Sequence, residues 1–178
     1  MTANKVIKGV VWTCGDQVDT YKILPKEYWM GDIGSLDEEK LADHVMEGYD
    51  PNFANEAKEK NYKFIIAGKN FGGGGKSIEH PIYALKGIGI EVILAESVSR
   101  YFYRNLINNG ILVIIQEGIK SFADTEDELT INLNTGILLN ETKNKEINFT
   151  APPEFLLKIL NKGGYKNYIK EQLKASKN

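Results

Sequence analysis

A run of four consecutive glycines, residues 72–75, stands directly before a group of polar side chains that could bind or act on a small anion. The group consists of Lys76, Ser77, Glu79 and His80. Glycine loses more conformational freedom on folding than any other residue, so such a run indicates a sharp turn or a close approach of the backbone to a ligand. Residues 64–67 before it predict a short buried strand, and the residues after it predict a helix that ends near Gly87. A loop between strand and helix directs backbone N–H groups and the positive helix end at an anion, so this stretch is the candidate site.

The elements that must position this loop are apolar runs of strand length. Residues 64–67, 92–95 and 111–115 form three such runs, separated by helix-length segments. This alternation predicts βαβ units with a parallel sheet that is buried on both faces. Residues 6–14 predict a further strand. The helix before the last run is expected to begin at an N-cap on Ser97 and to stop at Gly110.

The flanking segments predict additional short elements. Residues 15–25 predict a polar loop, and residues 36–48 predict a helix capped by Ser35 or Asp37. Residues 50–61 are polar and are expected to cross the surface of the protein. Further on, two short strands are expected around Asn134, another within residues 145–153, and helices from Pro153 and over residues 165–175. We expect one α/β domain over residues 1–178, with a parallel βαβ core, additional short β-strands, and residues 119–178 as an appendage.

Composition narrows the class of protein. The chain has 178 residues and a net charge of −2, without the basic stripe of an electrostatic nucleic-acid binder. It has no apolar run near the roughly 20 residues needed to span a bilayer, and its first residues lack the apolar centre of a signal peptide. We therefore expect a cytoplasmic protein with neither a nucleic-acid nor a membrane partner. With Cys14 as its one cysteine, the chain is expected to hold no metal or cofactor of the thiolate-bound kinds.

One interpretation of the glycine run is a phosphate-binding P-loop. The letters GGGGKS contain the end of the pattern G-x-x-x-x-G-K-[ST], in a strand–loop–helix context. The first glycine of the pattern falls on Asn70, however, and the strand at residues 92–95 runs into Glu96 where a magnesium-binding Asp would be expected.

A second interpretation uses more of the chain. Residues 68–80 fit most of the pattern G-x-N-F-G-x-G-S-S-R-E-H, and A-E-S (residues 95–97) and F-x-R-N (residues 102–105) follow in the expected order. Upstream, GDQVDTYKILP is similar to G-D-x-[IV]-D-T-D-x-I-x-P. Over residues 10–115 the sequence thus resembles the small subunit of isopropylmalate dehydratase, a leucine-biosynthesis enzyme of the aconitase superfamily.

This resemblance implies a swivelling β/β/α domain and a hydro-lyase that dehydrates or isomerises a hydroxy-dicarboxylic acid. It also implies a partner, the large subunit, which carries a four-iron–four-sulfur cluster. In the family, the first serine of S-S-R supplies the base, the arginine binds a substrate carboxylate, and the last Asp of D-T-D lies beside the serine.

The sequence departs from the family at those positions. There is one extra residue between Gly72 and Glu79, Ile78 stands at the arginine, and Tyr21 stands at the last Asp of D-T-D. Our interpretation makes Ser77 the base and lets Lys76 replace the arginine as a point charge.

The remaining assignments also follow from the resemblance. His80 would help to protonate the leaving group. Substrate would be bound by Gly73, Gly74 and Gly75 together with Asp19 and Thr20, whose loop then faces the active site, and Tyr28 and Trp29 would wall the side-chain pocket. The alternative is a non-catalytic paralogue that keeps the fold as a binding or assembly module.

Overall fold

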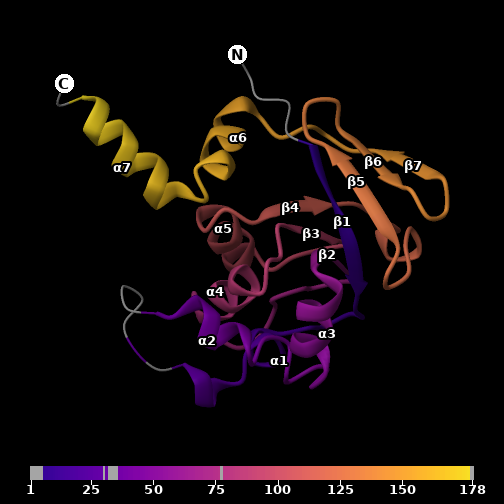
Figure 1. Ribbon diagram of the computed structural model, residues 1–178, viewed down its shortest axis with the longest axis horizontal. Coiled ribbons are helices and arrows are strands. Elements are labelled where there is room, and N and C mark those ends of the chain that lie inside the picture. The colour runs from indigo at the N-terminus through magenta and orange to yellow at the C-terminus, as the bar shows by residue number, and fades with distance from the viewer. Residues whose placement is uncertain (1–5, 30, 32–35, 77, 177–178) are drawn as a thin grey trace.

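The computed structural model describes residues 6–29, 31, 36–76 and 78–176 (Figure 1). Within these residues a single mixed sheet has the strand order β4-β3-β2-β1-β5-β6-β7. The sheet and its helices form an α/β fold, as the sequence predicted. None of the described helices is both long and apolar enough to cross a bilayer.

The first half of the sheet is parallel. It consists of β1 (Val6–Thr13), β2 (Tyr62–Ala67), β3 (Val92–Ala95) and β4 (Leu112–Ile115). The connections contain α1 (Thr20–Ile23), α2 (Glu38–Ala42), α3 (Phe53–Lys60), α4 (His80–Gly87) and α5 (Arg100–Asn108), with a 3-10 turn over Lys26–Tyr28. All of β3 is buried, as expected for a strand covered on both faces. The predicted parallel βαβ core is confirmed.

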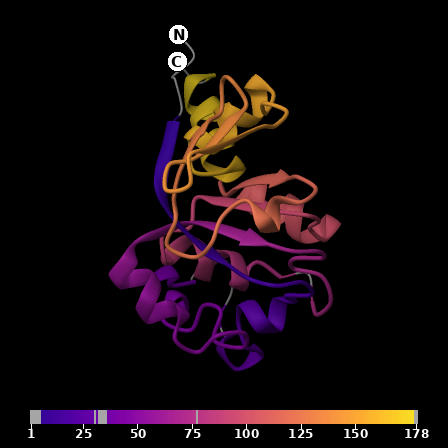
Figure 2. The same ribbon diagram turned by 90° about the vertical axis from the view of Figure 1, so that its right-hand side faces the viewer.

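The second half of the sheet is antiparallel. After a 3-10 turn over Ile119–Ser121, β5 (Glu128–Asn132) pairs with the other edge of β1, and β6 (Ile137–Asn140) and β7 (Lys145–Asn148) follow. These are the predicted additional strands. The chain ends in α6 (Glu154–Asn161) and α7 (Tyr165–Ala175). Both views place these elements at one end of the molecule and α1 to α3 at the other (Figure 1 and Figure 2).

Alternating side chains of the central strands belong to two hydrophobic clusters on opposite faces of the sheet. On β2, Ile65 belongs to the cluster under α1 to α5, whereas Phe64 and Ile66 belong to the cluster under β5, β6 and α6. The pattern explains why the strand reads as one continuous apolar run: both of its faces are covered.

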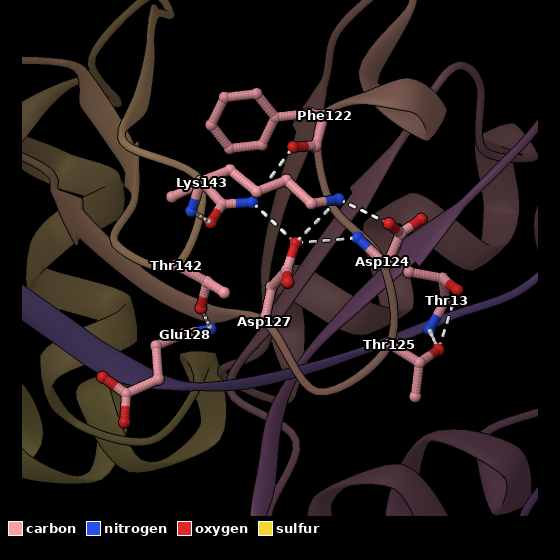
Figure 3. A network of polar contacts seen from close by, with 9 residues as sticks. Thr13, Phe122, Asp124, Thr125, Asp127, Glu128, Thr142 and Lys143 are labelled. Carbon is pink, nitrogen blue, oxygen red and sulfur yellow. Dashed lines mark hydrogen bonds and ion pairs between the residues drawn. The ribbon is translucent and has the colours of Figure 1, made fainter.

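A buried polar network fixes the start of the antiparallel half (Figure 3). Asp127 accepts hydrogen bonds from the amide of Asn140 (2.9 Å) and the backbone N–H of Asp124 (2.9 Å), and forms an ion pair with Lys143 (3.1 Å). Burial alone would raise the pKa of Asp127, but these hydrogen bonds and the lysine outweigh it, so the pKa lies below its ordinary value.

Several local expectations are wrong. Residues 50–61 do not merely cross the surface, because α3 buries Phe53, Ala54 and Ala57. The helix expected over residues 36–48 is shorter and spans Glu38–Ala42. Its expected cap at Asp37 is confirmed, because Oδ1 accepts from the N–H groups of Glu39 and Lys40.

Two further differences lie next to the candidate site. Ser97 does not cap α5, which begins only at Arg100. Thr20 lies within the short helix α1, in a segment expected to be a loop.

Candidate functional site

The glycine loop leaves the carboxyl end of β2 and is tied to the chain that leaves β3. The N–H of Asn70 donates to Ser97 Oγ (2.8 Å), and Ser99 Oγ donates to the carbonyl of Gly72 (2.8 Å). Phe71 and Val98 form a parallel β-bridge between the two segments. The loop therefore lies beyond the carboxyl ends of neighbouring parallel strands, the usual place for ligands in such sheets.

Close packing disfavours a side chain at several positions of the loop, and two of these also have a positive φ. Gly72 has φ +66°, and a Cβ there would lie 2.1 Å from the ring of Phe102 on α5. Gly75 has φ +70°, and a Cβ there would lie 2.2 Å from Thr20 Oγ1. The loop is thus held between α5 and α1. Gly73 is buried, and its N–H donates to the carbonyl of Asn70 (3.1 Å).

The start of α1 supports the loop from the other side. Asp19 caps this helix, and its Oδ1 accepts from the N–H groups of Tyr21 and Lys22, both at 2.9 Å. The cap places the buried Thr20 so that its hydroxyl reaches the carbonyls of Gly74 (3.4 Å) and Lys76 (3.3 Å). In a trans peptide the N–H points opposite to the C=O, so the N–H of Gly75 is directed away from Thr20.

A cavity of about 310 Å³ lies between the glycine loop and the first turns of α5. Its lining combines small, charged and aromatic groups: Thr20, Gly72, Gly74, Gly75, Lys76, Ser99, Tyr101, Phe102 and Asn105. Within the described part of the chain, neither the ammonium of Lys76 nor the side-chain amide of Asn105 has a hydrogen-bond or ion-pair partner. The cavity therefore offers an unpaired cation beside exposed loop backbone, which suits an anionic ligand.

Neither Tyr28 nor Trp29, the residues expected to wall the pocket, lines this cavity. Trp29 stacks on Tyr21 with ring centroids 4.9 Å apart, and its Nε1–H donates to the carbonyl of Leu24 (2.9 Å). Tyr21 in turn lies against the loop, since a Cβ at Gly75 would be 2.9 Å from its ring. Trp29 is thus separated from the loop by the ring that stands where the family has an aspartate.

Tyr28 faces another direction. Its ring stacks on His44 at 3.6 Å, and its hydroxyl donates to Glu47 Oε1 (3.1 Å). Burial first, and the hydrogen bond to Glu47 second, raise the pKa of Tyr28 above its ordinary value. These contacts join the segment after α1 to the turns that follow α2.

Comparison with known proteins identifies the family of the chain. Residues 33–118, which include the glycine loop, match the model of the aconitase C-terminal domain. The isopropylmalate/citramalate isomerase small subunit of Methanocaldococcus jannaschii is 42% identical over 171 residues, covering 96% of this chain and 98% of that protein. The crystal structure of 3-isopropylmalate dehydratase (leuD) from the same organism superposes with a TM-score of 0.84 at 36% identity, covering 98% and 100% of the two chains.

The chain belongs to the isopropylmalate dehydratase small-subunit family. The resemblance seen in the motifs is thereby confirmed, and the P-loop interpretation is set aside. Family membership does not select a substrate, because the methanogen homoaconitase small subunit of Methanothermobacter thermautotrophicus is also 42% identical, over 163 residues that cover 92% of this chain and 90% of that protein.

Among the assigned site residues, the structure brings Thr20, Gly74, Gly75 and Lys76 to the cavity. Ser77, which we interpreted as the base, lies outside the described residues. His80, at the start of α4, is 9% exposed and does not line the cavity. Neither of its ring nitrogens has a hydrogen-bond partner among the described residues.

The sequence assignments missed the α5 side of this family site. Ser99 and Tyr101 line the cavity, as do Phe102 and Asn105, which the motif had marked but which were not assigned to the site. Tyr101 and Asn105 are four residues apart on a helix that follows a core strand, so they share one face. That spacing was the available signal.

The donor set of this chain does not fit an iron–sulfur cluster. Cys14 is the one cysteine, and burial raises the pKa of its thiol to about 12, which disfavours the thiolate that binds metal. In the described part of the chain, no three His, Cys, Asp or Glu side chains are grouped so that they could hold a metal ion.

Proposed function

We propose that this chain is the small subunit of a cytoplasmic hydro-lyase that dehydrates or isomerises a small hydroxy-dicarboxylic acid. It would act together with a large subunit that carries a four-iron–four-sulfur cluster. The observation that carries the proposal is the cavity in which Lys76, a cation without a partner among the described residues, lies beside the glycine loop. The names of the relatives, which are small subunits of dehydratases and isomerases, support the reaction class.

In this proposal the loop binds one carboxylate of the substrate. The Gly75 N–H is directed away from Thr20, and Lys76 supplies the charge that Ile78 cannot supply at the arginine position of the family. An ammonium is a compact point charge and lacks the two-pronged geometry of a guanidinium, so the loop N–H groups must fix the orientation of the carboxylate. Gly73 and Gly74 shape the loop, and Asp19 acts through Thr20 as a positioning residue.

Proton transfer would also come from this chain. Ser77 would remove the carbon-bound proton, and His80 would assist protonation of the leaving group from its enclosed position behind the loop. The cluster, when present in the complex, would supply a Lewis acid for the leaving hydroxyl. Tyr21 would form the aromatic side of the substrate pocket, backed by Trp29 and, more remotely, by Tyr28.

A non-catalytic paralogue is the competing function. The isoleucine at position 78 and the tyrosine at position 21 favour it, because both replace charged groups on which the family's chemistry depends. Against it, the loop keeps a lysine with no partner among the described residues, at the wall of a cavity of small-molecule size.

The test is reconstitution with the large subunit encoded in the same genome, under anaerobic conditions with iron and sulfide. Dehydration of isopropylmalate, citramalate and malate is followed by the absorbance of the unsaturated product. Lys76→Ala should raise KM by roughly tenfold to a hundredfold, the equivalent of a hydrogen bond to a charged group. Lys76→Arg should retain most binding, and Lys145→Ala on β7 is the control.

Turnover by Lys76→Ala with an unchanged KM would contradict the carboxylate role. An assembled complex that turns over no hydroxy-dicarboxylate would favour the binding-module alternative.

A further inference from the structure

The two arginines of the chain lie together at the edge of the candidate site. Arg100 and Arg104 are four residues apart on α5, so their side chains emerge from the same face, roughly 6 Å apart at Cβ. Both are exposed, and neither forms a hydrogen bond or an ion pair through its side chain with any described residue. The ion pairs that the described residues do form use lysines or a histidine as the cation, for example Lys86 with Glu38. Two unpaired guanidiniums therefore form a local positive edge on a chain of net charge −2.

An exposed aromatic side chain, Tyr101, lies on the neighbouring face of the same helix. Tyr101 is 66% exposed, more than any other large hydrophobic side chain of the described residues, and it lines the cavity. Exposed Arg and Tyr side chains are the residue types most enriched where proteins bind one another. Neither arginine lines the cavity, although Tyr101 and Asn105 do, so the two guanidiniums lie on the face of α5 next to the cavity and do not belong to the ligand's immediate surroundings.

We propose that Arg100, Tyr101 and Arg104 form the surface on which the large subunit docks, and that the facing surface of the large subunit carries carboxylates. The inference rests on the proposed function, in which the partner must bring its cluster to this cavity because this chain has one cysteine and its described residues form no metal-binding group. Docking over Tyr101 closes the mouth of the cavity. Carboxylates opposite the two guanidiniums fix the orientation of the partner, since planar guanidinium–carboxylate pairs are directional.

The experiment measures binding of the purified chain to the purified large subunit by calorimetry, at low and moderate salt. Arg100→Glu combined with Arg104→Glu should weaken binding by about a hundredfold or more, and Tyr101→Ala by about tenfold. The charge-matched control combines Lys145→Glu on β7 with Lys170→Glu on α7, two exposed lysines that have no ion pair among the described residues. The Kd of this control for the large subunit should stay within about threefold of the Kd of the unchanged chain. Salt should weaken binding of the unchanged chain more steeply than binding of the arginine variant.

The outcomes separate the two proposals. If the unchanged chain binds the large subunit and the double arginine variant binds equally well, the docking surface is wrong and the proposed function stands. If the control weakens binding as much as the arginine variant, the effect is one of net charge and the surface is again wrong. If the unchanged chain does not bind the large subunit, both proposals fail. Sedimentation of each variant alone tests a second copy of this chain as the occupant: self-association that the arginine substitutions abolish would overturn the assignment to the large subunit. Thermal unfolding followed by circular dichroism confirms that each variant is folded.

Discussion

Alanine substitutions at two adjacent glycines of the loop can test the close contact between the loop and α1. Gly74 and Gly75 have nearly the same positive φ, +76° and +70°. Their surroundings differ. A Cβ at Gly74 would meet only Asp19, at an ordinary 3.5 Å, whereas a Cβ at Gly75 would lie 2.2 Å from Thr20 Oγ1 and 2.9 Å from the ring of Tyr21. Alanine at each position therefore separates backbone strain from close packing.

The expected magnitudes follow from these contacts. Either alanine must adopt a left-handed conformation, which costs about 1–2 kcal/mol. Gly75→Ala must in addition displace the buried Thr20 or move the loop, which adds about 1–3 kcal/mol as in other overpacked sites. Both substitutions restrict the unfolded chain equally, so that contribution cancels in the comparison. We expect Gly74→Ala to lower the free energy of unfolding by about 1–2 kcal/mol and Gly75→Ala by about 2–5 kcal/mol.

The assay is equilibrium unfolding in urea, followed by far-ultraviolet circular dichroism, together with substrate KM in the reconstituted complex. Combining Gly75→Ala with Thr20→Ala removes the oxygen that the new methyl group meets, so the double variant should recover part of the stability lost by Gly75→Ala. Equal free energies and equal KM values for the two single alanine variants would refute the close approach of Gly75 to α1. Absence of recovery in the double variant would show that Thr20 is not the residue in contact.

Three further predictions concern buried groups. Thr20→Val should lower the free energy of unfolding by about 1 kcal/mol, because the hydroxyl that reaches the loop carbonyls is removed. Thr20→Ser keeps a hydroxyl and should lose less, and the reverse order in urea unfolding would contradict this contact. With its pKa raised to about 12 by burial, Cys14 should resist alkylation at pH 8 until the chain unfolds, and rapid labelling of folded protein by iodoacetamide would contradict its burial. The pKa of Asp127 lies below its ordinary value of 3.8, so its carboxylate stabilises the fold fully above that pH and the benefit is lost as the pH falls through the folded pKa. The stability gap between the unchanged chain and Asp127→Asn should therefore narrow below about pH 4 in urea titrations, and a gap that is constant with pH would count against the network.

The parts of the fold that could be predicted from sequence are those in which one local pattern dominates. The strand at residues 92–95 and the helix at residues 165–175 lie where they were expected, because a short apolar run and an amphipathic repeat are unambiguous signals. Helix α3 was missed because only Phe53 and two small alanines mark its buried side within an otherwise polar stretch.

The candidate site divides in the same way. The contact between Thr20 and the glycine loop could be predicted, because both segments carry motifs of the family and the resemblance implies that both face the active site. The packing of Tyr28 on His44, and the position of Tyr101 at the cavity, depend on how separate elements meet in space. Such contacts leave no local pattern in the sequence, because an aromatic side chain near the surface can line a pocket or stack on another ring equally well.

The place of β1 at the junction of the two half-sheets sets the order of events during synthesis. This strand is made first, yet its antiparallel neighbour β5 begins about 115 residues after β1 ends. At usual translation rates the ribosome needs roughly 6–23 seconds to make that intervening chain. Throughout this interval one edge of β1 has no strand to pair with, and unpaired edges of this kind promote aggregation. The nascent chain is therefore most exposed to misassembly, and most dependent on chaperones, until β5 emerges and completes the sheet.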